Sequence, residues 1–438
     1  MDGFTHSSWI RDIMATQPQA DTPRDIDSTI SDEDIERATA QIGIPQRRFV
    51  KAFNETATTD GMRHFAFGLV GDDNPLWHDP EYAKNTRWRG PVAHPLFIQT
   101  MGINECPPYS PEHKALFRGL FRGIGKYLAS TTWTFFKPIF PGDAAYEEYV
   151  TSDIQVKQSS FSGGRSVIDS YRSLYVDAAG TPLATREHSL VNAERKGSKE
   201  KGKYADLARH TYTPDDIARI DEVYAAEQRR GATIRYFEDV EVGEALTPVA
   251  KGPLSMVDLI CRHIATGMAD GYDIGPLRYG WRARGKIAPF YTPDAWGVPQ
   301  PQQRVHWDDS RAQDLGLPGG YDYAIMRFAW LTHLLTNWMG DDGWIESYGV
   351  ELRQFNFVGD FHIIGGSVTG KSVENGRPTV EIVLEATNQR GDITTRGKAK
   401  ILLPSREYGA VILPEAPLDL VRRGANMMAE AAARKAAG

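Results

Sequence analysis

Residues 71–80 read GDDNPLWHDP, and GPVAHPLF follows at residues 90–97; this pair of segments is the most informative part of the sequence. A related pair lies in the second half of the chain, VHWDD at residues 305–309 and GGYDYA at residues 319–324. A motif that recurs within one chain indicates repeated structural units. The sequence therefore predicts two similar domains in tandem.

Strands and one apolar helix surround these motifs. In the second half, residues 324–338 are strongly apolar, which predicts a buried helix. One face of it would hold Ala324, Phe328, Leu331, Leu335 and Trp338. Residues 380–386 and 399–403 then alternate apolar with charged side chains, and Arg390-Gly391-Asp392 between them predicts a hairpin. The first half repeats the pattern, with strands expected at residues 132–136 and 166–176. Each half is therefore expected to be an antiparallel sheet around a helix.

Composition excludes several classes of protein. The chain has 438 residues, a formal net charge of −7 and an isoelectric point of about 5.9, so a general nucleic-acid or membrane-surface binder is disfavoured. Two distant cysteines, Cys106 and Cys261, are too few for a disulfide framework or a structural zinc site. The first six residues lack a signal-peptide core, and no apolar run is long enough for a bilayer. We expect a cytoplasmic protein without metal or cofactor.

Composition along the chain predicts its domain organisation. We expect a polar arm at residues 1–30, an N-terminal domain at 31–194, a linker and connecting helix at 195–231, and a C-terminal domain at 232–405. An insertion at about residues 268–304 interrupts the C-terminal domain. An Ala- and Arg-rich tail follows at 406–438, and we expect it to contribute little to a core. The basic stretch at 195–203 is either a phosphate-binding patch or, more simply, a solvated connector.

The two motif pairs resemble the signature of the MaoC-like dehydratases, a family of (R)-specific enoyl-CoA hydratases and acyl dehydratases. The resemblance covers about residues 30–405. It implies an α+β double hot-dog, with two curved antiparallel sheets each wrapped around a buried helix and joined edge to edge. In this family an Asp and a His hold and activate the water that adds to an α,β double bond, as general acid–base catalysis requires. A backbone N–H at the start of the buried helix faces the thioester oxygen.

Neither half matches this pattern completely. The first half keeps Asp72, a candidate catalytic residue, and Asn74, a candidate substrate-binding residue, but Trp77 stands where the family has its histidine. His78 is displaced by one residue, and such a shift turns a side chain in extended backbone the other way. Pro95 occupies the oxyanion position and has no N–H. The first half is therefore predicted to serve packing and the shape of the acyl tunnel.

The second half keeps His306, with Asp308 two residues later, and places Ala324 at the oxyanion position. Tyr323 replaces the second histidine of the family, and Pro301 stands where the upstream aspartate is expected. Three aspartates are candidate partners of His306: Asp308, Asp270 before the insertion, or Asp72 from the other half.

The insertion at about residues 268–304 is rich in aromatic and basic side chains. As a lid, it would bring Arg282, Arg284 and Lys286 to the phosphates of coenzyme A while its aromatics line an acyl pocket. Alternatively, it is a surface loop with a small core of its own.

The sequence leaves three functions open. The first is a hydratase or dehydratase acting on an acyl thioester such as an acyl-CoA, as a monomer or as a homodimer of double hot-dogs. A hot-dog thioesterase is disfavoured, because residues 324–338 contain no Asp or Glu that could activate water. A non-catalytic half-enzyme would instead complete the site of a partner subunit.

Overall fold

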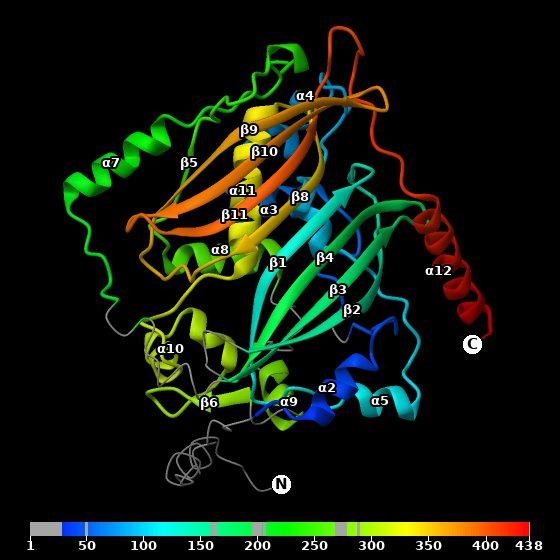
Figure 1. Ribbon diagram of the computed structural model, residues 1–438, viewed down its shortest axis with the longest axis vertical. Coiled ribbons are helices and arrows are strands. Elements are labelled where there is room, and N and C mark those ends of the chain that lie inside the picture. The colour runs from blue at the N-terminus through cyan, green and yellow to red at the C-terminus, as the bar shows by residue number, and fades with distance from the viewer. Residues whose placement is uncertain are drawn as a thin grey trace, which may run out of the picture.

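The computed structural model describes residues 29–48, 51–158, 164–194, 204, 207–267, 278–286 and 290–437. A nine-stranded antiparallel sheet, ordered β2-β3-β4-β1-β8-β11-β10-β9-β5, runs through the molecule (Figure 1). Its strands are β1 Gly125–Phe135, β2 Tyr146–Gln158, β3 Arg165–Val176, β4 Pro182–Ala193, β5 Val249–Lys251, β8 Trp344–Leu352, β9 His362–Glu374, β10 Arg377–Asn388 and β11 Ile393–Leu402. A separate ribbon pairs β6 Tyr291–Pro293 with β7 Pro299–Pro301.

The strand order shows the internal repeat. From the centre outward, β1, β4, β3 and β2 of the first half mirror β8, β11, β10 and β9 of the second. The halves meet where β1 pairs with β8, for example at Thr132 and Gly349. The expectation of two antiparallel sheets joined edge to edge is confirmed.

The long helix α11, Ala324–Met339, is buried from Met326 to its end and lies against the sheet of the second half (Figure 1). Its sequence has no Gly or Pro and is apolar almost all round, so burial is the only stable environment for it. The helix also contacts the first half, because Trp330 Nε1 donates a 3.1 Å hydrogen bond to the carbonyl of Leu69. The helix expected at residues 324–338 is confirmed.

The first half has no long helix after its motif, contrary to our expectation. The segment Pro95–Thr100 forms only a 3-10 helix, labelled η3, and the chain leaves it through Gly102 at a φ of 109°. A side chain at residue 102 would press on Glu147 and Tyr175, and L-residues rarely adopt this backbone conformation. The helical segment thus ends at Met101, whose backbone is extended with a φ of −100° and a ψ of −168°, and Gly102 follows with positive φ.

Shorter helices precede each motif. In the first half α3, Thr59–Phe65, continues as the π-helix η1, Ala66–Val70, and in the second half the corresponding helix is α8, Met256–Thr266. The two pack closely, since a Cβ atom on Gly68 would lie 3.1 Å from the carbonyl of Cys261. The remaining helices are α2 Asp32–Thr39, η2 Pro75–Trp77, α4 Pro80–Ala83, α5 Pro111–Phe117, α7 Pro214–Ala225, η4 Phe237–Asp239, α9 Arg278–Lys286, η6 Gln302–His306 and α10 Asp309–Asp314.

The chain end corrects another expectation. Residues Leu418–Ala437 form a helix, α12, beside the first-half sheet (Figure 1). Met427 of α12 is buried with Leu174 and Val176 of β3, so the tail does contribute to a core. Gly180 and Gly424 make this approach possible, because a Cβ atom on Gly424 would lie 2.3 Å from the carbonyl oxygen of Gly180.

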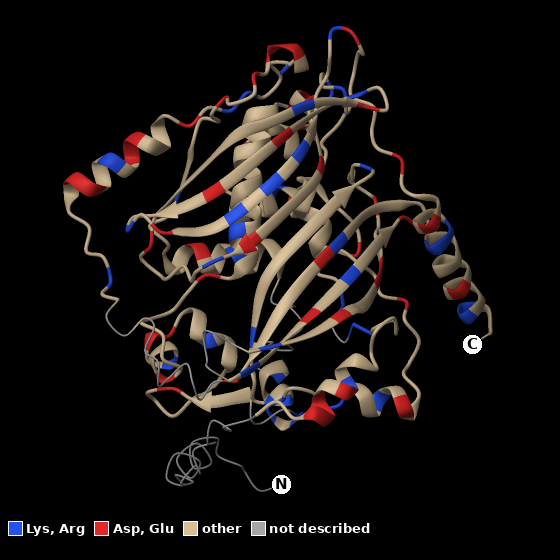
Figure 2. Cartoon of the chain, viewed as in Figure 1, with Lys and Arg blue, Asp and Glu red and all other residues tan. Residues whose placement is uncertain are grey.

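Charges of both signs are interspersed on the exposed strands (Figure 2). Arg396 of β11 pairs across the ladder with Glu385 of β10 at 3.1 Å. Within the described ranges, no helix has the length and hydropathy needed to cross a membrane. The linker at 195–203 lies outside the described residues.

Candidate active site

His306 is held at the end of η6 by the backbone of the second motif. Its Nδ1 lies 2.8 Å from the carbonyl oxygen of Tyr321. A carbonyl can only accept, so Nδ1 carries the proton and Nε2 of the neutral ring keeps its lone pair. His306 is therefore oriented as a base.

Tyr323 and Ala324 lie beside this imidazole. The ring of Tyr323 stacks on that of His306 with centroids 3.7 Å apart and an interplanar angle of 27°. Tyr323 is the N-cap of α11 and Ala324 its first residue. The first N–H groups of an α-helix have no acceptor within the helix and carry partial positive charge. The structure thus brings together His306, Tyr323 and the helix start at Ala324, as the sequence predicted.

Two side chains of α8 complete this cluster, and the sequence reading missed them. Nε2 of His263 lies 3.1 Å from the hydroxyl of Tyr323, and the guanidinium carbon of Arg262 lies 4.1 Å from the centroid of its ring. Arg262 is only 1% exposed. A signal was present: the capping box of Ser255 and Asp258 marks a helix start, and Leu259, Arg262 and Thr266 then fall on one face. An arginine on the buried face of a helix indicates a specific polar contact, because arginine is almost never fully buried without a partner.

Burial keeps both imidazoles neutral. Desolvation lowers the pKa of His306 to about 3, opposed by the backbone hydrogen bond to Tyr321 and reinforced by the charge of Arg262. The pKa of His263 falls to about 4, again mainly through desolvation and then through Arg262. Near neutral pH the cluster therefore holds two neutral imidazoles next to one cation.

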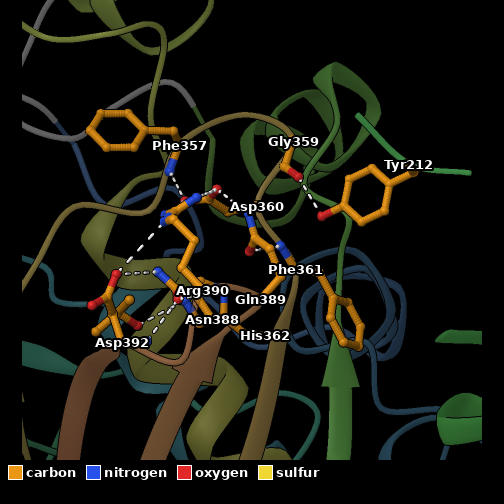
Figure 3. Close-up of polar contacts among 11 residues, drawn as sticks. Tyr212, Phe357, Gly359, Asp360, Phe361, His362, Asn388, Gln389, Arg390 and Asp392 are labelled. Carbon is orange, nitrogen blue, oxygen red and sulfur yellow. Dashed lines mark hydrogen bonds and ion pairs between the residues drawn. The ribbon is translucent and has the colours of Figure 1, made fainter. Parts of the chain in front are cut away.

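A second layer of contacts fixes the loop that positions His306. Tyr321 forms a β-bridge with Phe357, and the N–H of Asp322 donates to the carbonyl of Asn356 at 2.9 Å. Asp360 in turn accepts from the N–H of Phe357 at 2.9 Å and binds both terminal nitrogens of Arg390 at 2.6 and 2.7 Å (Figure 3). This bidentate ion pair holds the segment before β9 to which Tyr321 and Asp322 are bound.

The aspartates near His306 are engaged elsewhere. Asp308 is the N-cap of α10, accepting from Ser310 Oγ at 2.6 Å and from the N–H of Arg311 at 3.3 Å. Asp322 is buried and pairs with Arg327 at 2.8 Å, and desolvation raises its pKa to about 6. Asp270 lies outside the described residues.

Asp72 does not meet His306. Its carboxylate accepts from the N–H of Asn74 and from Thr336 Oγ1, both at 2.9 Å. Thr336 lies 13 residues beyond Tyr323 on α11, a separation of about 20 Å along the helix axis. Pairing of Asp72 with His306 across the junction, one of the sequence alternatives, is therefore wrong in this structure.

Asp72 belongs to a buried polar cluster around the far end of α11. Nζ of Lys251 lies 2.7 Å from Nδ1 of His333 and 2.8 Å from the carbonyl oxygen of Val70. Desolvation lowers the pKa of Lys251 to about 8 and raises that of Asp72. Asn74, predicted to bind substrate, instead donates to Asp341 at 2.8 Å and accepts from the N–H of Leu76.

In the first half, Trp77 occupies the position where the family has its histidine. Trp77 is 3% exposed and meets the ring of His94 edge-on, with centroids 5.4 Å apart. His94 accepts from the N–H of Leu96 and contacts Thr332 Oγ1, and Pro95 offers no donor. These contacts agree with a packing role for this half.

The basic side chains of the insertion lie on α9. Arg282 and Lys286 are exposed and Arg284 is partly buried. Among the described residues, no group of three or more His, Cys, Asp or Glu side chains is arranged to hold a metal ion.

Comparisons with known proteins agree with this architecture. Residues 43–186 match the family model described as "FAS1-like, dehydratase domain region". A structure named "MaoC-like dehydratase" is 17% identical over 84% of this chain and 99% of its own, with a TM-score of 0.56. A putative MaoC domain protein dehydratase from Chloroflexus aurantiacus is 13% identical, covering 82% of this chain and 94% of its own, with a TM-score of 0.49. No curated protein matches the chain. The double hot-dog fold and the resemblance to MaoC-like dehydratases are confirmed.

Proposed function

We propose that this chain, with the double hot-dog fold of the MaoC-like dehydratases, adds water to, or removes it from, the α,β position of an acyl thioester. The observation that carries the proposal is the orientation of His306. Its Nδ1 is committed to the carbonyl of Tyr321, so Nε2 is an acceptor beside the start of α11. A base and a helix N-terminus are the two groups that this reaction needs.

The chemistry follows from their positions. In hydration, Nε2 of His306 takes a proton from water while the water oxygen bonds to Cβ of the enoyl thioester. The π electrons move to the thioester carbonyl, and the N–H of Ala324 stabilises the resulting enolate oxygen. Cα then takes up a proton. Dehydration follows the same steps in reverse.

The acyl carrier is proposed to be coenzyme A. α9 carries Arg278, Arg282, Arg284 and Lys286 within nine residues and has no acidic side chain. One guanidinium group can bind two phosphate oxygens at once. A short helix with four cationic side chains therefore suits the phosphates of coenzyme A. Removing the three charges of Arg282, Arg284 and Lys286 should raise KM for an enoyl-CoA. KM for the matching enoyl-pantetheine, which lacks the nucleotide, should change little.

The test is to incubate the purified chain with crotonyl-CoA and longer enoyl-CoAs and follow the loss of conjugated enoyl-thioester absorbance. His306→Ala should lower turnover roughly 10²–10⁴-fold, the usual contribution of a general acid–base. His78→Ala, which alters a histidine of the first motif, is the matched control and should retain activity. Near-normal rates in His306→Ala would refute the assignment and direct attention to the first half.

Two other outcomes identify the alternatives. Release of free thiol from saturated acyl-CoAs without hydration would indicate a thioesterase, although α11 carries no carboxylate. Absence of both activities in the isolated chain would indicate a half-enzyme that requires a partner subunit. Either result would refute the proposal as stated.

A further inference from the structure

Among the residues that the structure describes, none of the candidate aspartates is placed to serve the proposed reaction as an acid. Hydration needs one group to take a proton from water and a source of the proton that reaches Cα. Asp308 caps α10, Asp322 pairs with Arg327, and Asp72 lies at the far end of α11. Two phenols contact the ring of His306: Tyr321 edge-on with centroids 4.6 Å apart, and Tyr323 stacked at 3.7 Å. Of the two, Tyr323 also has its hydroxyl 3.1 Å from Nε2 of His263, which makes it the candidate acid.

The surroundings of Tyr323 are unusual for a packed tyrosine. Its ring stacks on the imidazole of His306 at 3.7 Å, and the guanidinium of Arg262 lies over the ring at 4.1 Å. Two planar groups cannot share one face of a ring at these distances. The phenol therefore lies between an imidazole on one face and a cation on the other.

The hydrogen bonds of His263 have a defined direction. Nη1 of Arg262 lies 3.1 Å from Nδ1 of His263, and a guanidinium can only donate. Nδ1 is thus the acceptor, and the proton of the neutral ring is on Nε2. Nε2–H then donates to the hydroxyl oxygen of Tyr323 at 3.1 Å. A donor to that oxygen and a cation over the ring both stabilise negative charge on the phenol oxygen.

We infer that Tyr323 is the general acid of the proposed reaction, and that His263 and Arg262 of α8 are the positioning residues that stabilise its phenolate. This inference rests on the proposed function. During hydration, the water O–H bond breaks toward Nε2 of His306 and the C–O bond forms at Cβ. The O–H bond of Tyr323 breaks toward Cα as the enolate collapses. The imidazolium then returns its proton to the phenolate, which restores both groups.

This arrangement replaces the family carboxylate by a neutral acid. A carboxylate next to Arg262 would remain ionised and could not donate a proton, whereas the phenol holds its proton until the enolate forms. The titratable and charged groups that face Tyr323 from the described elements are His263 and Arg262 on α8, His306 on η6 and the neighbouring Asp322.

The first test is Tyr323→Phe, which removes the hydroxyl and keeps the stacked ring. We expect kcat to fall roughly 10²–10⁴-fold, with KM changed less than threefold, as for loss of a general acid. A rate within about threefold of the unaltered chain would overturn the inference, since a phenol that serves only packing should tolerate this change.

The second test separates positioning from structure. His263→Ala should lower kcat roughly 10- to 100-fold, the range for loss of one hydrogen bond to a developing charge. It should also move the alkaline limb of the kcat profile to higher pH, because the phenolate loses a stabilising donor. His263→Gln offers an amide N–H in place of Nε2–H and should restore part of both effects. If the profiles of the two variants coincide with that of the unaltered chain, His263 has no part in catalysis.

His78→Ala serves as the control, because it removes an imidazole that contacts the Phe67 ring and lies outside this cluster. Thermal unfolding of each variant checks that the fold survives. Failure of this inference is distinct from failure of the proposed function. If His306→Ala is inactive while Tyr323→Phe is not, hydration stands and the acid is another group. If the unaltered chain hydrates no enoyl thioester, the function itself is wrong.

Discussion

Lys251 offers a direct test of the buried polar cluster around the far end of α11. The residue is 7% exposed, and desolvation lowers the pKa of its ammonium from 10.5 to about 8. In the unfolded chain the lysine keeps its proton up to about pH 10.5, so between the two values the unfolded state binds a proton that the folded state has released. Stability must therefore rise with pH in this window. The shift corresponds to a cost of about 3 kcal/mol at and below neutral pH.

The perturbation is Lys251→Met, which has a similar length and no charge. The variant loses the hydrogen bonds to Val70 and His333, but that loss is the same at every pH. We expect the free energy of unfolding of the unaltered chain, minus that of Lys251→Met, to increase by about 3 kcal/mol between about pH 7 and pH 10.5. Urea unfolding followed by tryptophan fluorescence measures this difference. Lys51→Met, at a side chain 86% exposed, is the control and should show no such rise. A difference that is constant with pH, or that falls, would refute the reasoning.

Four further predictions concern the site and its supports. The imidazole of His306 stays neutral down to about pH 3, so kcat/KM should hold level from pH 7 to about pH 5, and an acid limb near pH 6.5 would contradict this. Asp308→Ala should lower the free energy of unfolding by about 1 kcal/mol through loss of a helix cap, but change the turnover rate only a few-fold. A rate loss as steep as that of His306→Ala would instead make Asp308 the catalytic partner of His306. Arg327→Met leaves the buried carboxylate of Asp322 without its ion-pair partner, with only the hydrogen bond from Asn356, and calorimetry should show a loss of about 3–5 kcal/mol. Trp77→Ala should open a cavity and cost about 3–5 kcal/mol while turnover persists, and an inactive but folded Trp77→Ala would place catalysis in the first half.

Much of the fold could be predicted from local pattern. The alternation at residues 166–176 corresponds to β3, Arg165–Val176, and the apolar run at 324–338 to α11. The two patterns are easily recognised, because the strand alternates without a break and the helix is apolar along its whole length. The long helix predicted for the first half is absent because the chain becomes extended at Met101, directly after η3, and continues through Gly102 at positive φ. The core contribution of α12 was missed because its buried residues, Gly424, Met427 and Ala431, can be recognised only once the strands are placed.

The site could be predicted only in part. His306, Tyr323 and Ala324 lie close in sequence to one motif, so their proximity follows from spacing. His263 and Arg262 come from a helix some forty residues earlier, and nothing local indicates that α8 faces Tyr323. The position of Asp72 was unpredictable for the same reason, because it depends on which end of α11 each motif meets. Long-range packing decides these contacts.

The pairing of β1 with β8 has a consequence for how such a chain can change over generations. In an assembly of two identical subunits, any substitution arises twice and alters both sites at once. Here one gene encodes both halves, so corresponding positions can diverge separately: Trp77 fills one while His306 occupies the other. The continuous sheet keeps the two halves in fixed stoichiometry whatever each becomes. One half is then free to act purely as scaffold while the other retains the chemistry.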